Sequence, residues 1–258
     1  MLRFRSISFC MLVALGCAVI SLSLGSRLRA ADPQPAPTAR GPLPPPGFID
    51  ACLDLIRDGR YAEAQARLAP VAADHPGWGR IHFYLGLAYH KDQLYGRARP
   101  LFERSIELEP DYRPATFYLG WALYYLGEPD KARQRFTTFL EHRPDYADAI
   151  FALGLIDFDA DDVSAAERRF RRAVEIATVA ADTAVEAKSR ARLADVLIRV
   201  GKLDAARAEL ERSVELAPHN HEAWHKLSLV HERLGDSVKA AAAREQHGKT
   251  LKHARSGS

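Results

Sequence analysis

The sequence predicts an all-α solenoid made of repeated helix–turn–helix units. Beyond Gly47 the chain repeats itself with a period of 34 residues, broken once by a longer spacing. Each unit has a turn residue, a small residue five positions later, and a large residue four positions after that. Glycine and aspartate at the turn favour the end of one helix before the next begins. The six turn residues are Gly59, Gln93, Gly127, Asp161, Gly201 and Gly235.

The other two repeated positions belong to the second helix of each unit. The small residue is always alanine, and the large residue is apolar in the first five units. The alanines are Ala64, Ala98, Ala132, Ala166, Ala206 and Ala240. The large residues are Leu68, Phe102, Phe136, Phe170, Leu210 and finally Arg244. Prolines close four of the units, at Pro76, Pro110, Pro144 and Pro218.

This pattern resembles the tetratricopeptide repeat. The second unit shows it most fully, as His82-x2-Leu85-Gly86-x2-Tyr89, then Ala98-x3-Phe102 and Pro110. The resemblance implies a right-handed superhelical solenoid over 48–254, in which each unit is two antiparallel helices and neighbouring units share their core. The expected units lie near 45–78, 79–112, 113–146, 147–180, 187–220 and 221–254.

Departures from the pattern carry further expectations. Six extra residues, about Ala181 to Glu186, precede the fifth unit and predict extended helices or a local change of superhelical pitch. Arg244 replaces the large apolar residue in the last unit, whose second helix is polar and is typical of a solenoid cap. Cys52 occupies the small position of the first unit, which predicts a packed thiol rather than a reactive one.

Residues 1–30 are typical of a signal peptide or membrane anchor. Arg3 and Arg5 precede an apolar run over 7–25, and small residues follow near its end. Cleavage would release an exported protein, periplasmic or extracellular; without cleavage, the run would be a single-pass anchor. Lipidation at Cys17 is a third alternative. Residues 31–47 hold seven prolines and predict a semi-rigid linker.

Charge argues against nucleic acid as a partner. The net charge of +3 depends on four arginines in the first 30 residues, which contain no acid. The rest of the chain is close to neutral and has no extended basic patch. We therefore expect a protein or peptide partner, with a membrane involved only through an uncleaved N-terminal segment.

The resemblance also implies where a partner would bind, because the first helix of each unit lines the concave groove in this family. The inward positions are rich in aromatic residues in the middle units and become basic towards the C-terminus. Exposed aromatic clusters favour binding, although each ring could instead pack between helices as core. The candidate groove residues are Phe83, Tyr84, His90, Lys91, Phe117, Tyr118, Trp121, Tyr124, Tyr125, Phe151, Phe158, Arg192 and Arg199.

Two motifs suggest metal chemistry. His221-Glu222-Ala223-Trp224-His225 has the spacing of a zinc hydrolase, and His231 lies where a third ligand would follow. An unbroken helix would turn His231 away from His225, so the motif is interpreted as part of the repeat; surface zinc on His219, His221 and His225 is another alternative. Residues 157–162 begin like a calcium loop, but Asp162 and Arg168 stand where glycine and glutamate are needed.

The sequence thus favours a non-catalytic scaffold that binds a polypeptide in an aromatic groove, exported or tethered to a membrane. We expect no enzyme activity, no cofactor and no metal. Three alternatives remain at this point: a zinc-dependent hydrolase using the 221–225 motif, an assembly subunit that binds through its convex face, and binding through the proline-rich segment.

Overall fold

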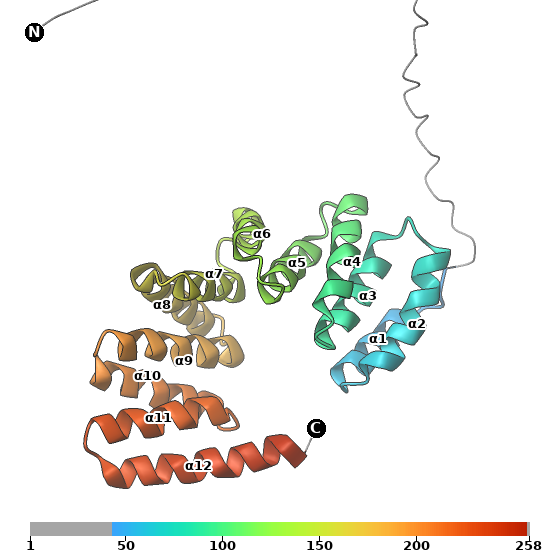
Figure 1. The fold of residues 1–258 in the computed structure, drawn as a ribbon. Helices are drawn as coiled ribbons and strands as arrows, with labels where there is room; N and C mark the ends of the chain where they lie inside the picture. The colour runs from blue at the N-terminus through green and yellow to red at the C-terminus, as the bar shows by residue number, and fades with distance from the viewer. Residues whose placement is uncertain (1–42, 257–258) are drawn as a thin grey trace, which may run out of the picture. The chain divides into compact units, whose positions relative to one another are not determined.

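The computed structural model describes residues 43–256, so the expected leader and most of the proline-rich linker lie outside the described residues. Twelve helices and no strand occur between residues 43 and 256, as expected for an all-α fold (Figure 1). The helices are α1 (Phe48–Arg57), α2 (Tyr61–Asp74), α3 (Gly79–Lys91), α4 (Tyr95–Leu108), α5 (Arg113–Tyr125), α6 (Pro129–His142), α7 (Ala147–Asp159), α8 (Val163–Val179), α9 (Thr183–Arg199), α10 (Leu203–Leu216), α11 (His221–Arg233) and α12 (Ser237–Ser256).

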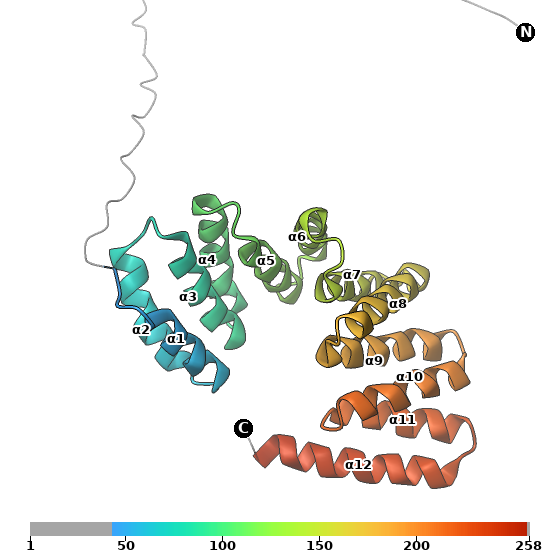
Figure 2. The same cartoon turned by 180° about the vertical axis from the view of Figure 1, so that it is seen from behind.

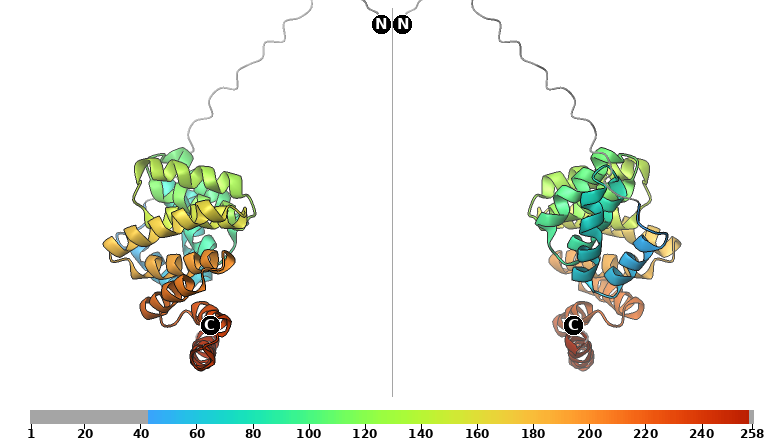
Figure 3. Two further views of the ribbon diagram at one scale, coloured as in Figure 1. Left: turned by 90° about the vertical axis from the view of Figure 1, so that its left-hand side faces the viewer. Right: turned by 90° about the vertical axis from the view of Figure 1, so that its right-hand side faces the viewer.

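The helices pack in the order of the chain, in pairs. Each odd-numbered helix packs on its even-numbered successor, and that second helix packs on the first helix of the next pair. First helices also contact one another across units: α1 contacts α3, α3 contacts α5, α5 contacts α7 and α7 contacts α9 (Figure 2). Side views show the pairs stacked one after another (Figure 3). The first helices therefore share one continuous face, on which residues of several units can meet.

Every predicted turn residue has a positive φ, between 60° at Gln93 and 80° at Gly235. Glycine adopts this left-handed conformation without a steric penalty, whereas Gln93 and Asp161 adopt it as side-chain-bearing residues. Asp162 then caps α8 by accepting a hydrogen bond from the Ala165 N–H at 2.9 Å. The aspartates at 161 and 162 thus form a turn and a helix cap, as the repeat pattern indicates.

A glycine on the first helix accommodates the phenylalanine ring of the second helix in the three central units. A Cβ added to Gly120 would lie 2.8 Å from the Phe136 ring, and one added to Gly154 would lie 2.7 Å from Phe170. Gly86 meets Phe102 in the same way at 2.8 Å. The close approach is therefore between a glycine and a ring, rather than between two helix backbones.

The remaining units show the same constraint with other residues. Where the second helix carries leucine, the facing position holds Cys52 in the first unit and Ala194 in the fifth. In the last unit Arg244 points outward to Glu232, opposite Ser228. Cys52 is buried, and burial raises the pKa of its thiol although Arg67 opposes the shift, so the thiol is packed and protonated at neutral pH.

The six extra residues lengthen the helices on both sides of the fourth junction. Each of α8 and α9 has 17 residues, against 13 or 14 in each of the helices α3 to α7 and in α10 and α11. The first helix of the fifth unit consequently begins at Thr183. Asp182 caps α9 by accepting a hydrogen bond from the Val185 N–H at 3.0 Å. Among the helices between residues 43 and 256, none combines the length and the apolar character that a membrane span requires.

The glycine–ring contact can be tested by a double-mutant cycle. Gly120→Ala forces a methyl group against Phe136 and should lower the free energy of unfolding by about 1–2 kcal/mol. Adding Phe136→Leu, which reproduces the Ala194 and Leu210 combination of the fifth unit, should recover about 1 kcal/mol relative to the sum of the single effects. Urea unfolding of the four proteins measures the coupling.

Gly248→Ala is the matched control, because nothing lies within 4 Å of a Cβ at Gly248 in α12. This substitution should stabilise the chain by about 0.5–1 kcal/mol through helix propensity alone. Additive effects of Gly120→Ala and Phe136→Leu would contradict the contact as the reason for the glycine.

Candidate functional site

A cavity of about 340 Å³ opens on the shared face of α3, α5, α7 and α9. Eight of the candidate groove residues line it, and three further lining residues come from inward positions of α7 and α9. The eight are His90, Lys91, Phe117, Tyr118, Trp121, Tyr125, Phe151 and Arg192; the others are Asp148, Leu155 and Lys188. Residues far apart in the sequence thus meet at one place, and we refer to it as the groove cavity.

Several candidate rings belong chiefly to the core. Phe83, Phe117 and Phe151 are buried, and the Phe117 ring centroid lies 5.2 Å from that of Tyr146 behind it. Trp121 is only 8% exposed. Most of the surface of these four rings is therefore packed between helices, as the alternative interpretation of the sequence expected. Each ring lies between the first helix and the second helix of its unit.

Tyr125 is the exposed aromatic residue of the groove cavity, with 51% of its surface accessible. Its ring is stacked with two others: the centroids of Tyr95 and Trp121 lie 4.5 Å and 5.8 Å from that of Tyr125, with interplanar angles of 16° and 23°. Stacked rings of this kind form a rigid apolar surface with little side-chain entropy left to lose. Tyr95 begins α4, so an analysis confined to first helices misses it.

His90 is the titratable group most strongly affected by this environment. Its ring lies 5.2 Å from Tyr95 and 5.4 Å from Tyr118. Burial, with a smaller contribution from the charge of Lys91, lowers the pKa of His90 to about 4. The imidazole is therefore neutral at physiological pH, and it lines the cavity as a polar but uncharged group.

The candidate residues beyond the cavity form their own contacts. The Tyr124 hydroxyl donates a hydrogen bond to Asp159 at 2.7 Å, and burial together with this bond raises the pKa of Tyr124. The Arg199 guanidinium lies 4.4 Å from the centroid of the Phe158 ring and pairs with Asp161. Tyr84 is half-buried against Phe83.

The expected basic end of the groove is largely neutralised by carboxylates. Arg192 pairs with Asp195 at 3.2 Å and Lys188 pairs with Asp148 while lying over the Phe151 ring. The partners are aspartates on the same first helix or on the preceding one. The basic positions alone therefore do not predict how much of their charge is neutralised. Lys91 is exposed and has no ion-pair partner among residues 43–256. It is thus the cation of the cavity that remains available to a ligand.

The HEAWH segment lies on α11, which runs unbroken from His221 to Arg233. His231 is buried 3.9 Å from Glu211, whereas His225 is exposed, so the two histidines face different ways. Glu222 pairs with Lys226 at 3.0 Å. Burial raises the pKa of Glu222, but the contact with Lys226 and the charge of Arg192 outweigh it and lower the pKa overall. No group of three or more histidine, cysteine, aspartate or glutamate residues between 43 and 253 is arranged to hold a metal ion.

Comparison with known families identifies the fold. Tetratricopeptide-repeat models match residues 50–113, 117–181 and 187–230, which together make up more than half of the chain. The chain is a tetratricopeptide-repeat protein. The expected family and its all-α superhelical fold are thereby confirmed, and the matched segments extend from α1 into α11.

Solved structures of other repeat proteins resemble the chain in fold. MamA is 20% identical, with a TM-score of 0.54 over 67% of this chain and 97% of MamA. PilF of Pseudomonas aeruginosa is 16% identical, with a TM-score of 0.65 over 82% of this chain and 92% of PilF. PilW, also 16% identical, has a TM-score of 0.66 over 77% of this chain and 90% of PilW. A search of curated proteins by sequence found no match.

The neutral state of His90 predicts a pH dependence of stability. The unfolded chain takes up a proton near pH 6.5, whereas folded His90 does so only near pH 4. The contribution of neutral His90 to the free energy of unfolding is therefore fully present above pH 6.5 and is lost as the pH falls towards 4. Between pH 7 and pH 5 the chain should lose roughly 1–2 kcal/mol more unfolding free energy than a His90→Phe variant.

Urea midpoints of the two proteins at both pH values measure this difference. Parallel losses in wild type and His90→Phe would mean that His90 titrates normally in the folded state.

Proposed function

We propose that this tetratricopeptide-repeat protein is a non-catalytic scaffold that holds a segment of another protein in the groove cavity. The observation that carries the proposal is Tyr125, which is half-exposed, stacks with Tyr95 and Trp121, and lines the groove cavity. Half-exposed aromatic rings in a rigid setting are characteristic of the residues that dominate binding energy in protein interfaces.

The cavity favours a segment with one apolar side chain and one acidic side chain. The apolar side chain would cover the accessible part of the Tyr125 ring, which supplies the hydrophobic contact. The acidic side chain would pair with Lys91. The neutral imidazole of His90, which lines the same cavity, adds a polar contact without a charge to desolvate.

We also propose that the protein is exported or tethered to a membrane. The support is the basic start and the apolar run of residues 1–30, followed by the proline-rich stretch of 31–47. A folded repeat domain behind such a leader would present its groove outside the cytoplasm. This part of the proposal depends on the sequence alone.

Tyr125→Ala tests the groove. The side chain is exposed, so its removal should leave the fold intact while affinity for a captured partner falls about tenfold or more. Trp121 is unsuitable for this purpose because it is buried. Affinity capture followed by titration of the identified partner gives the measurement.

Val238→Ala is the matched control, because Val238 is a large exposed side chain on α12 with 80% of its surface accessible and no part in the groove cavity. Equal affinities of the Tyr125→Ala and Val238→Ala proteins would place the binding surface elsewhere.

N-terminal sequencing of the chain recovered from fractionated cells tests its location. Cleavage should give a new N-terminus after about residue 25 or 30 in an exported fraction, because small residues there suit a signal peptidase. An intact N-terminus in the membrane fraction is the result expected of an anchor. An intact chain in the cytosol would contradict both forms of the proposal.

A further inference from the structure

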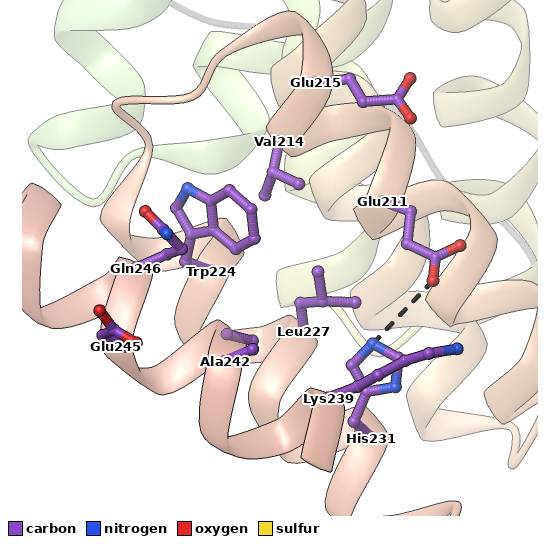
Figure 4. A pocket seen from close by; sticks show the side chains of 11 residues that line it. Glu211, Val214, Glu215, Trp224, Leu227, His231, Lys239, Ala242, Glu245 and Gln246 are labelled. Carbon is purple, nitrogen blue, oxygen red and sulfur yellow. Dashed lines mark ion pairs between the residues drawn. The ribbon is translucent and has the colours of Figure 1, made fainter. Parts of the chain in front are cut away.

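A second cavity, of about 400 Å³, lies between α10 and α12 with α11 as its floor. Figure 4 shows Trp224, Leu227 and His231 of α11 between residues of the two flanking helices. Val214 of α10 and Ala242 of α12 complete the apolar walls. None of its lining residues belongs to the groove cavity. We call this second space the α11 cavity.

A single position explains why the α11 cavity exists. The position directly before the large residue of the second helix carries a long side chain in five units and alanine in the sixth, at Ala243. In the earlier units it holds Arg67, Leu101, Arg135, Arg169 and Glu209. Because Ala243 has no side chain beyond Cβ, no long side chain extends over α11 from this position of α12.

The corresponding space two units earlier is filled by an arginine. There Asp157 of α7 is buried and pairs with Arg133 of α6 at 2.6 Å and with Arg169 of α8. Arg169 occupies the place that Ala243 takes in the last unit, and Asp157 occupies the place of His231. In the fifth unit Glu209 extends over the first helix in the same manner and accepts a hydrogen bond from Arg190 at 2.7 Å.

The rim of the α11 cavity is acidic. It carries three glutamates, Glu211, Glu215 and Glu245, and one lysine, Lys239. Lys239 pairs with Asp236, Glu215 with Arg212 and Glu245 with Lys249. Glu211 lies 3.9 Å from both Arg207 and His231, beyond hydrogen-bond distance, so its carboxylate is the one with capacity for a direct partner.

The buried imidazole beside Glu211 is a second sign of an incomplete site. His231 is 3% exposed, and its Nδ1 atom has no hydrogen-bond partner among the described residues. Buried polar atoms are normally paired, because an unpaired one costs free energy. His231 therefore lies in a setting whose polar contacts are only partly made.

We propose that the α11 cavity binds an arginine side chain of a protein partner, in place of the arginine that the chain itself supplies at Arg169. The guanidinium pairs with Glu211 beside His231, and the aliphatic stem lies against Leu227 and Val214, towards Trp224 at the other end of the cavity (Figure 4). The Trp224 indole is held in place at that end, because its N–H donates to the Pro218 carbonyl at 2.9 Å. Arginine fits better than lysine because its planar fork can form two parallel hydrogen bonds with the Glu211 carboxylate. This inference does not depend on the groove cavity.

The test uses the full chain labelled with ¹⁵N and three small probes: N-acetyl-arginine methylamide, its neutral citrulline isostere and its lysine counterpart. The Trp224 indole resonance, assigned by Trp224→Phe, reports binding. We expect a saturable shift with the arginine probe in the millimolar range, with affinity about tenfold higher than for the citrulline or lysine probe. Glu211→Gln should weaken the arginine probe about tenfold.

Ala242→Leu should close the cavity and abolish the shift, whereas Ala241→Leu is its matched control, since Ala241 is exposed and does not line the cavity. Equal binding of the arginine and citrulline probes would overturn the proposal. Equal binding of the lysine probe, unchanged affinity in Glu211→Gln, or no saturable shift with the wild-type chain would overturn it as well.

Discussion

The contact between a glycine on one helix and a phenylalanine ring on the next holds the central units together. At Gly86, Gly120 and Gly154 a single added methyl group would come within 2.8 Å of the ring. The two helices of a unit can approach this closely only because the glycine has no side chain. The ring is in turn fully buried, so each helix pair has a fixed spacing from which the next pair is placed.

The same rings connect this packing to the groove cavity. Phe102 lies 6.0 Å from Tyr118 of the next unit, and Phe136 lies 5.4 Å from Trp121. Trp121 supports Tyr125, whose exposed face is the centre of the proposed binding surface. The buried Phe136 thereby sets the position of Tyr125, the residue that a partner would touch. Such coupling is expected of repeat proteins, because neighbouring units share one core.

The α11 cavity illustrates the opposite situation, in which one unit leaves out what the others provide. A repeat packs well when each position repeats its chemistry, so an alanine among long side chains leaves a space. Arg169 meets Asp157 in the fourth unit, whereas Ala243 in the last unit has no side chain that could reach His231 or Glu211. The residue directly before the large residue of the second helix thus decides whether the space over the first helix is filled, as by Arg169, or left open, as at Ala243.

The sequence by itself determined the repeat: its turns, its buried alanines and rings, and the set of positions that meet on the first helices. These follow from local chain geometry, since a 34-residue period and a positive φ at Gly59 or Gly127 need no knowledge of distant contacts. Only the tertiary structure decided which rings are core and which remain accessible, because Phe117 and Tyr125 share one helix but face different neighbours. It also placed Tyr95 beside Tyr125 and paired Arg192 with Asp195. Burial and ion pairing depend on side chains from several helices, and periodicity along one chain does not fix them.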